Sequence, residues 1–417
     1  MILAVKGTRD LIPPATAIWN RIEQTARSVF HVYNYQEIRT PILEFTQLFA
    51  RGVGEETDIV TKEMYTFQDR DGSSLTLRPE ATASVIRAYL EHRLDQRPGL
   101  QKLYYMGPMF RRERPQKGRY RQFYQIGAEA IGSESPAVDA EVIEMVVELL
   151  QQVGLPDFEL LLNSVGCPEC RPAYVARLRE RLREQAGALC ADCRRRVETN
   201  PLRVLDCKVP EDQRIIESLP SILDHLCAAC RDHFQQVRRM LGARGIAYRE
   251  APRLVRGLDY YMRTTFEVLH GALGAQNSVL GGGRYDGLAQ ALGSRTPAPG
   301  IGFSIGEDRL VLTLEQSGAL LAEGQIDVYV APVGATVLEH AASLARELRR
   351  AGLVVELGFE ARLKRSLETA NRLGVRRVLI VGEDEIAAGR YTLRDMQTGE
   401  QASLTREALR QQLAAVK

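Results

Sequence analysis

Two stretches that read as strands, one on either side of a basic turn, constrain the fold of this chain most. They read LQKLYYMGPMFRRE (100–113) and RQFYQIGAEAIG (121–132). In the turn, six of the eleven residues from Arg111 to Arg121 are Arg or Lys, and only Glu113 is acidic. After the turn the sequence begins to alternate at residues 123–126, which is typical of a strand, and a polar connection between two strands indicates a hairpin. The pattern therefore predicts a long antiparallel hairpin.

The positive charge of this turn is local. The chain has 417 residues and a formal net charge of only +2, so the composition as a whole shows no polyanion signal. Any nucleic-acid surface must therefore be local, and the basic turn is a segment that fits one. Beyond the turn, one carboxylate, Glu129, closes an otherwise apolar run. This combination indicates a ligand that is bound both by the positive charge of the turn and by a carboxylate a few residues further along the chain.

The segments before the turn read as helix, strand and hairpin in order. Residues 15–33 carry apolar side chains at helical spacing. Residues 33–45 read as a strand that meets Pro41, and Pro41 belongs at an edge or a bulge because proline cannot donate to a sheet. Residues 63–80 read as a hairpin with an Asp-Gly turn. The helix that follows opens on Glu80, where the helix dipole favours an anion.

Residues 1–165 form the first predicted part of a domain, and the composition changes at its end. Segment 166–248 is mostly helical by pattern, contains all seven Cys of the chain and looks inserted. Strand signals return in 249–320, and a polar linker at 318–325 leads to 326–417, where strands alternate with helices. Such alternation implies a mixed or parallel sheet with right-handed crossovers. We expect one domain in two parts, an inserted domain and a separate α/β unit.

Four arginines stand beside strand segments: Arg78, Arg111, Arg256 and Arg309. The planar, permanently charged guanidinium suits phosphate and carboxylate oxygens. The chain has no GxxxxGK[ST] loop, no HExxH motif and no Ser/His/Asp arrangement. A reaction that relies on positioning and charge, with a nucleophile supplied by the substrate, suits such a site. A single Arg is more often a solvated ion-pair partner, but four with distinctive neighbours favour a binding site.

Several motifs resemble those of class II aminoacyl-tRNA synthetases, and specifically of the histidyl-tRNA synthetase family. Pro41 in RTPILE resembles the motif 1 proline at the dimer interface. Residues 110–129, FRRERPQKGRYRQFYQIGAE, resemble motif 2, and 300–310, GIGFSIGEDRL, resemble motif 3. Class II motifs are loose, but RGLDYY (256–261) and GGGRYDGL (281–288) are specific to the histidine family. The resemblance covers essentially the whole chain.

The resemblance implies an α+β fold: a class II antiparallel sheet with flanking helices, an inserted helical domain, and a C-terminal α/β anticodon-binding domain. It also implies a ligase that activates L-histidine with ATP to histidyl-adenylate and pyrophosphate, then transfers histidine to the 3′ end of its tRNA. The alternative is the regulatory subunit of ATP phosphoribosyltransferase, a paralogue that binds histidine without charging tRNA. That paralogue typically lacks the C-terminal unit and has lost active-site arginines that this chain keeps.

The resemblance assigns catalytic and ATP-binding roles to three arginines. Arg111 would contact the ATP α-phosphate and the histidine carboxylate, and Arg309 would hold the γ-phosphate. Arg256 would stabilise charge at the α-phosphate while the carboxylate displaces pyrophosphate. Mg²⁺ would neutralise the leaving pyrophosphate. The glycines of GGGRYDGL would floor the pocket, and we assign no catalytic role to Arg284 or Asp286.

The resemblance also implies how histidine is recognised. Glu129 would accept a hydrogen bond from the imidazole, and Tyr261 would hold the other side of the ring. The complete set of expected histidine-binding residues is Glu80, Thr82, Gln125, Glu129, Tyr260 and Tyr261. A site that satisfies both ring nitrogens can reach a discrimination of ~10⁴–10⁵ without editing. The alternative for Glu129 is a structural ion pair with Arg119 or Arg121 across the hairpin.

The basic turn would meet the acceptor end of the tRNA, whose phosphates and exposed terminal base reward Arg and Lys. The expected contacts are Arg114, Gln116, Lys117 and Arg119. The motif 1 region implies a homodimer. No apolar run approaches the ~18 residues of a membrane span, and seven Cys without an export signal read as reduced thiols. We therefore expect a cytoplasmic protein with no membrane partner.

The cysteines form three CxxC pairs, Cys167/Cys170, Cys190/Cys193 and Cys227/Cys230, and Cys207 stands alone. The spacing of the first two pairs suits a four-Cys structural zinc site, which we take as the expected ligand set. Three pairs are one too many for a single site, so which pairs bind stays open. The alternatives are thiols without metal and, with less support, a redox CxxC.

Overall fold

The structure is a computed structural model that describes residues 2–273, 277–318, 326–334 and 336–414. The chain forms two compact units, residues 1–321 and 322–417. Most of the linker expected at 318–325 lies outside the described residues. Among the described residues, no helix is long and apolar enough to cross a membrane.

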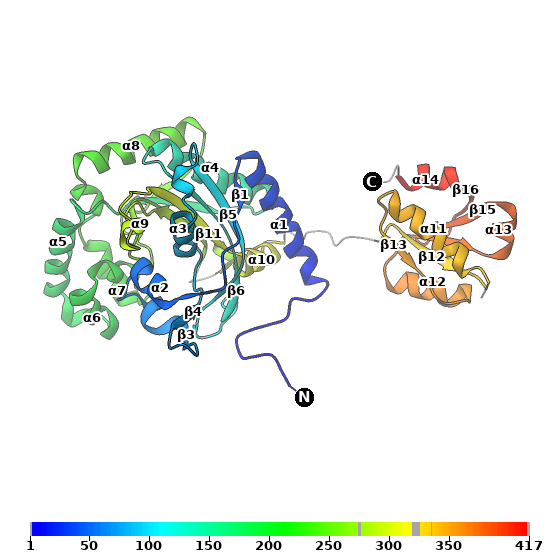
Figure 1. Ribbon diagram of the computed structural model, residues 1–417, viewed down its shortest axis with the longest axis horizontal. Helices are drawn as coiled ribbons and strands as arrows, with labels where there is room; N and C mark the ends of the chain where they lie inside the picture. The colour runs from blue at the N-terminus through cyan, green and yellow to red at the C-terminus, as the bar shows by residue number, and fades with distance from the viewer. Residues whose placement is uncertain (1, 274–276, 319–325, 335, 415–417) are drawn as a thin grey trace. The chain divides into compact units, whose positions relative to one another are not determined.

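The first unit is built on an eight-stranded sheet of order β1-β5-β6-β11-β10-β9-β7-β8 (Figure 1). All neighbours are antiparallel except the two edge pairs, β1 with β5 and β7 with β8. Its strands are β1 (Gln36–Glu37), β5 (Gln101–Phe110), β6 (Gln122–Ile131), β7 (Glu159–Ser164), β8 (Arg249–Glu250), β9 (Met262–Leu269), β10 (Ser278–Arg284) and β11 (Gly300–Gly306). The β5–β6 pair confirms the predicted hairpin.

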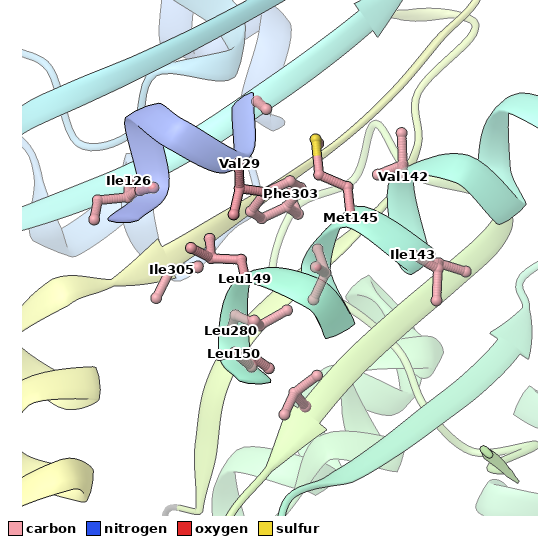
Figure 2. Packing of buried hydrophobic residues seen from close by; sticks show 14 of the residues in the cluster. Val29, Ile126, Val142, Ile143, Met145, Leu149, Leu150, Leu280, Phe303 and Ile305 are labelled. Carbon is pink, nitrogen blue, oxygen red and sulfur yellow. The ribbon is translucent and has the colours of Figure 1, made fainter. Parts of the chain in front are cut away.

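One face of this sheet carries the main hydrophobic core. Even-numbered residues of β6, such as Ile126 and Ala128, are buried there, as are Phe303 and Ile305 of β11. Figure 2 shows Phe303 beside side chains of the covering helices, including Val29 of α1. These helices are α1 (Ala15–Val32), α4 (Pro136–Gln152), α8 (Ala228–Ala243) and α10 (Glu307–Gln316). Because side chains alternate along a strand, the odd-numbered residues of β6 must face the other side.

The opposite face is covered by shorter elements. A three-stranded sheet of order β2-β4-β3 includes the predicted Asp-Gly hairpin, β3 with β4. The single strand predicted over 33–45 is wrong: Pro41 lies in neither strand, between the short strands β1 and β2. Proline offers no N–H to extend the ladder. The elements on this side are β2 (Leu43–Phe45), α2 (Thr46–Val53), η1 (Ile59–Glu63), β3 (Tyr65–Gln68), β4 (Ser74–Leu77), α3 (Thr82–Glu91), η2 (Leu94–Gln96) and α9 (Leu288–Ala291).

A helical segment connects β7 to β8 and has its own hydrophobic cluster. Its helices α5, α6 and α7, green in Figure 1, lie next to one another. Tyr174 and Leu178 of α5 are completely buried in this cluster. Tyr261 belongs to the same cluster, so the core of the segment continues to β9. The helices are α5 (Arg171–Glu184), η3 (Ala186–Ala188), α6 (Ala191–Thr199), η4 (Pro201–Asp206), α7 (Pro210–Ser218), η5 (Ile222–His225) and α8.

The second unit contains a five-stranded sheet of order β13-β12-β14-β15-β16. The first three strands are parallel and the last two antiparallel, which confirms the mixed sheet expected from strand–helix alternation. Its elements are β12 (Val328–Pro332), α11 (Leu338–Arg350), β13 (Val355–Leu357), α12 (Leu363–Arg372), β14 (Arg377–Val381), α13 (Glu383–Ala388), β15 (Arg390–Asp395), β16 (Gln401–Thr405) and α14 (Arg406–Ala414).

Candidate active site

A pocket of about 1000 Å³, including the open space at its mouth, lies on the face of the large sheet away from the main core. Its lining includes nine of the residues predicted from the sequence: Glu80, Thr82, Arg111, Arg119, Gln125, Arg256, Tyr260, Tyr261 and Arg309. Segments separated by more than 200 residues thus meet in one cavity. Arg78 does not line it: its guanidinium donates to the carbonyls of Thr40 and Pro108 at 3.0 Å each, which is a structural role.

The alternation of β6 places Gln125 and Glu129 on the pocket side of the sheet. Gln125 lines the pocket, and its Oε1 atom has no hydrogen-bond partner among the described residues. A buried acceptor left without a partner costs free energy. An ammonium group entering the pocket would offer the donor that this oxygen lacks.

Glu80 precedes α3 and caps its N-terminus. Its two carboxylate oxygens accept hydrogen bonds from the backbone N–H groups of Thr82 at 2.8 Å and Ala83 at 2.9 Å. Burial nevertheless raises the pKa of Glu80 above its ordinary value, against the opposing effect of these bonds. Tyr260 places its hydroxyl 3.5 Å from the same carboxylate. Glu80 is thus held rigidly at the pocket wall.

Glu129 lies beneath the pocket surface rather than in its lining, with an exposed fraction of 1%. Its carboxylate accepts hydrogen bonds from the hydroxyls of Tyr285 at 2.6 Å and Thr82 at 2.8 Å. Burial raises its pKa to about 8. The structural ion pair with Arg119 or Arg121 is not formed, because Glu129 is paired with Leu103 near the far end of the hairpin.

Gly302 makes room for this buried acid. It is paired with Glu129 in the β6–β11 ladder. A Cβ atom at Gly302 would lie 1.7 Å from the Glu129 carboxylate oxygen and 2.6 Å from the carbonyl oxygen of Ala128. The glycine in motif 3 is therefore required by a close approach on a neighbouring strand.

Arg111 stands where β5 enters the basic turn. Its Nε donates to the carbonyl of Pro79 at 2.9 Å, and its guanidinium lies 5.3 Å from the ring centroid of Phe123. Glu113 is 3.8 Å from it. The side chain is thus oriented by a backbone oxygen and an aromatic ring, while its charge is only loosely neutralised.

Arg256 comes from the loop before β9. Its Nη1 lies 3.2 Å from Glu267, and its buried Nε has no partner among the described residues. A Cβ atom on Gly281 would lie 2.0 Å from Nη2 of this arginine. The absence of a side chain at Gly281 therefore leaves the space that the Arg256 guanidinium occupies. This is why a glycine is needed at this point of the pocket lining.

Arg309 extends from the first turn of α10. Burial lowers its pKa, and the neighbouring Arg119 lowers it further. Two guanidinium groups that line one pocket and repel each other favour a ligand with several negative charges. Asp308 beside it is engaged elsewhere, with Arg9 at 2.7 Å and the backbone N–H of Tyr124 at 2.9 Å.

The basic turn is a tight loop between β5 and β6. Gln116 and Arg119 exchange backbone hydrogen bonds of 3.2 and 2.9 Å. Arg114, Gln116 and Lys117 are exposed, whereas Arg119 reaches the pocket and pairs with Glu113 at 3.0 Å. The turn thus joins an exposed basic surface to the pocket lining.

The chain was compared with known proteins. The sequence profile described as histidyl-tRNA synthetase matches residues 7–310, and one described as anticodon binding domain matches 327–415. The histidine–tRNA ligase of Solibacter usitatus is 68% identical over 415 residues, covering 100% of this chain and 99% of that protein. That of Koribacter versatilis is 59% identical, covering 98% and 95%.

The chain belongs to the histidyl-tRNA synthetase family. The solved structure of apo S. aureus histidyl-tRNA synthetase is 37% identical, with a TM-score of 0.81 and coverage of 99% and 100%. The predicted α+β class II fold with its inserted helices and C-terminal anticodon-binding domain is confirmed, and so is its place among the ligases. The regulatory-subunit alternative is not favoured, since full-length relatives at this identity are ligases.

Several residues that hold the predicted site residues Glu129 and Arg256 in place were not identified from the sequence. Tyr285 and Tyr105 donate to Glu129, at 2.6 and 3.4 Å, and Glu267 pairs with Arg256. Tyr285 was visible in GGGRYDGL as a large residue after a glycine run. Nothing in the sequence marks Glu267, whose role depends on the register of β9 and β10.

Arg284 is completely buried and forms ion pairs with Asp139 at 2.7 Å and Asp286 at 2.8 Å. We expect Arg284→Ala to lower the free energy of unfolding by ~3–5 kcal/mol, because Asp139 would be left buried without its partner. Urea unfolding followed by fluorescence of Trp19, the single tryptophan, measures this. Arg39→Ala, at a pair whose arginine side chain is 79% exposed, is the control. A change within ~0.5 kcal/mol for both would contradict the expectation.

The expected zinc ligand set is wrong in its pairing. Cys167 and Cys170 lie with Cys227 and Cys230, whereas Cys190 and Cys193 lie with Cys207 and Asp212. The spacing between the first two CxxC pairs is compatible with a single four-cysteine zinc site. The sequence alone, however, does not show which helix N-termini, and therefore which cysteine pairs, lie close together. Helix α8 returns to the start of α5 and brings the third CxxC pair against the first.

Proposed function

We propose that this pocket carries out the activation step of the family's ligase reaction. L-histidine and ATP react to give histidyl-adenylate and pyrophosphate, and the histidyl group then passes to the 3′ end of histidine tRNA. The observation that carries the proposal is the meeting of Arg111, Arg256 and Arg309 with Glu80 and Gln125 in one cavity. Three guanidinium groups suit a triphosphate, and the two side-chain acceptors suit an amino group.

The arginines divide the charge of the reaction among them. A carboxylate oxygen of histidine attacks the α-phosphorus, and the bond from that phosphorus to the bridging oxygen of pyrophosphate breaks. Arg111 orients the carboxylate and the α-phosphate, and Arg256 stabilises the charge that develops there. Arg309 holds the γ-phosphate. Donors that are oriented before the reaction cost no reorganisation at the transition state.

The lining residues fit a Mg²⁺ ion that arrives with ATP. Mg²⁺ keeps several waters and usually needs only one or two protein carboxylates besides the phosphates. Glu113 lines the pocket between Arg111 and Arg119 and would hold such an ion. When bound, the ion neutralises the leaving pyrophosphate.

Histidine specificity would arise from Glu129 and a pair of tyrosines in the pocket lining. Tyr260 and Tyr261 have ring centroids 4.7 Å apart, and Glu129 is covered in the unliganded pocket. We propose that the imidazole donates one N–H to Glu129 once the rings of this pair rearrange, while Tyr261 holds the other nitrogen. Glu80, Thr82 and Gln125 bind the α-amino group.

The remaining surfaces would serve the tRNA and a second copy of the chain. Arg114, Gln116 and Lys117 would contact the acceptor end together with Arg119, and the C-terminal unit would bind the anticodon. Exposed apolar side chains just after Pro41 and on the same small sheet support a homodimer interface: Ile42, Leu43, Phe45 and Phe67 are 41–56% exposed. Grouped apolar exposure of this kind marks interaction surfaces. We place the enzyme in the cytoplasm, where charged tRNA is used.

Amino-acid-dependent ATP–pyrophosphate exchange tests the function. We expect exchange with histidine and none above background with the other nineteen amino acids, in the absence of tRNA. The reason is that apolar mimics would leave the polar groups around Glu129 unpaired. Histidine binding by calorimetry without any exchange would contradict the proposal and restore the regulatory-subunit alternative.

A further inference from the structure

We propose that the segment between β7 and β8 holds two structural zinc ions, one bound by Cys167, Cys170, Cys227 and Cys230 and the other by Cys190, Cys193, Cys207 and Asp212. All seven cysteines of the chain are used, and none of them lines the reaction pocket. In each group the ligand atoms lie within 4.8 Å of one another. This inference does not depend on the proposed function.

The first group, the four-cysteine site, has the sulfur spacing of a tetrahedral centre. The Sγ atom of Cys167 lies 3.8 Å from the Sγ atoms of both Cys170 and Cys227, and the Sγ atom of Cys170 lies 3.9 Å from that of Cys230. Zinc–sulfur bonds of ~2.3 Å in a tetrahedron require sulfur–sulfur edges of ~3.8 Å. A disulfide would need ~2.05 Å. The distances therefore match shared coordination of one ion rather than bonding in pairs.

The surrounding backbone favours thiolates at this site. Cys170 and Cys227 are the N-caps of α5 and α8, so two helix N-termini face the sulfurs. The backbone N–H of Cys167 donates to Cys170 Sγ at 3.2 Å. Gly166, with φ of +67°, lies under the site, and a Cβ atom there would be 2.8 Å from that sulfur. Helix N-termini and N–H groups stabilise the thiolate form that binds metal.

The second group, the Cys₃Asp site, contains a buried carboxylate. Asp212 is completely buried, and its recorded hydrogen-bond partners among the described residues are groups of Cys190 and Cys207 rather than a Lys or Arg side chain. It accepts the backbone N–H of Cys190 at 2.9 Å, and its other oxygen is 3.2 Å from Cys207 Sγ. Cys190 and Cys207 have sulfurs 4.0 Å apart. Buried charges in proteins are usually paired or coordinate a metal, and carboxylate and thiolate are both zinc ligands.

Both sites lie in a scaffold that supports the pocket. Arg171, one residue after Cys170, donates to the backbone carbonyl of Tyr261. Arg203, in η4 between the two halves of the Cys₃Asp site, donates to the carbonyl of Arg256 at 3.3 Å. The two ions would thus fix the helices that position the RGLDYY segment.

The test is the zinc content of the full chain purified without chelator, measured by mass spectrometry. We expect two zinc ions per chain. The double variant Cys227→Ser/Cys230→Ser should retain only the ion of the Cys₃Asp site, and Asp212→Asn should weaken or empty that site alone. The matched controls are His225→Ala and Asp206→Asn, which lie near the cysteines but outside both groups. Both should keep two ions.

A measurement on the unaltered chain guards against variants that fail to fold. Titration with a mercurial thiol reagent should release two zinc ions as the seven thiols react, detected with a zinc-sensitive dye. Release of no zinc, or a content near zero, overturns both sites. One ion, lost in only one of the two variants, overturns the site whose variant has no effect.

Discussion

Arg256→Ala lowers the rate of histidine-dependent ATP–pyrophosphate exchange by roughly 10²- to 10³-fold, the loss expected when one oriented donor is removed from a developing charge. The fold should survive, because the partner left behind, Glu267, has a side chain that is 18% exposed and can be hydrated. Exchange kinetics at saturating histidine, with circular dichroism as a check on folding, measure the effect. A near-normal rate would exclude the role assigned to Arg256.

Gly281→Ala provides a second route to the same result. Its Cβ atom would lie 2.0 Å from the Arg256 guanidinium, so the arginine must move although its charge remains. A loss of exchange comparable to that of Arg256→Ala would show that position as well as charge matters. Gly287→Ala is the matched control, since a Cβ atom there meets nothing within 4 Å. Equal effects of the two glycine variants would contradict the assignment.

Glu129→Gln weakens histidine binding by roughly 10- to 150-fold, corresponding to ~1.5–3 kcal/mol for a hydrogen bond to a charged group. The pKa of Glu129, raised by burial to about 8, adds a pH dependence. The ionised carboxylate is the stronger acceptor for an imidazole N–H, so binding to the unaltered protein should tighten as the pH rises through about 8. Above about pH 7 the imidazole of free histidine is already mostly neutral. Calorimetry at several pH values measures both effects.

The stability of the unliganded protein should fall as the pH rises, whereas its affinity for histidine should increase. The folded-state pKa of Glu129 lies above its ordinary value of 4.5. Its contribution to stability is therefore fully present below that value and is lost as the pH rises through about 8. Without histidine, the melting temperature of Glu129→Gln should fall less between about pH 6 and 9 than that of the unaltered chain.

Glu307→Gln separates the two effects. This acid is also buried, with a pKa raised to about 9, and it does not line the pocket. The substitution should reduce the pH-dependent loss of stability without weakening histidine binding. Wild-type histidine affinity in Glu129→Gln, or equal losses of affinity in both variants, would exclude Glu129 as the imidazole acceptor.

The sequence by itself determined most of the local elements and named nine of the residues that line the pocket. Two runs that read as strands on either side of the basic turn, with alternation beginning at Phe123, predicted the central hairpin. The same alternation places Gln125 and Glu129 on one face. The arginines could be named because guanidinium groups beside strands carry a recognisable chemistry, and the resemblance to a family supplied their roles.

The tertiary structure decided what depends on contacts between distant segments. Glu129 is buried and has a raised pKa because β11 passes beside it with Gly302, and Arg256 has its place because Gly281 leaves space for it. The cysteines show the limit most clearly. Their spacing allowed several pairings, and only the return of α8 to the start of α5 selects Cys227 and Cys230 as partners of the first pair. The spacing of cysteines along the chain limits which of them could come together. Which of them do come together depends on which helix ends are adjacent in the folded protein.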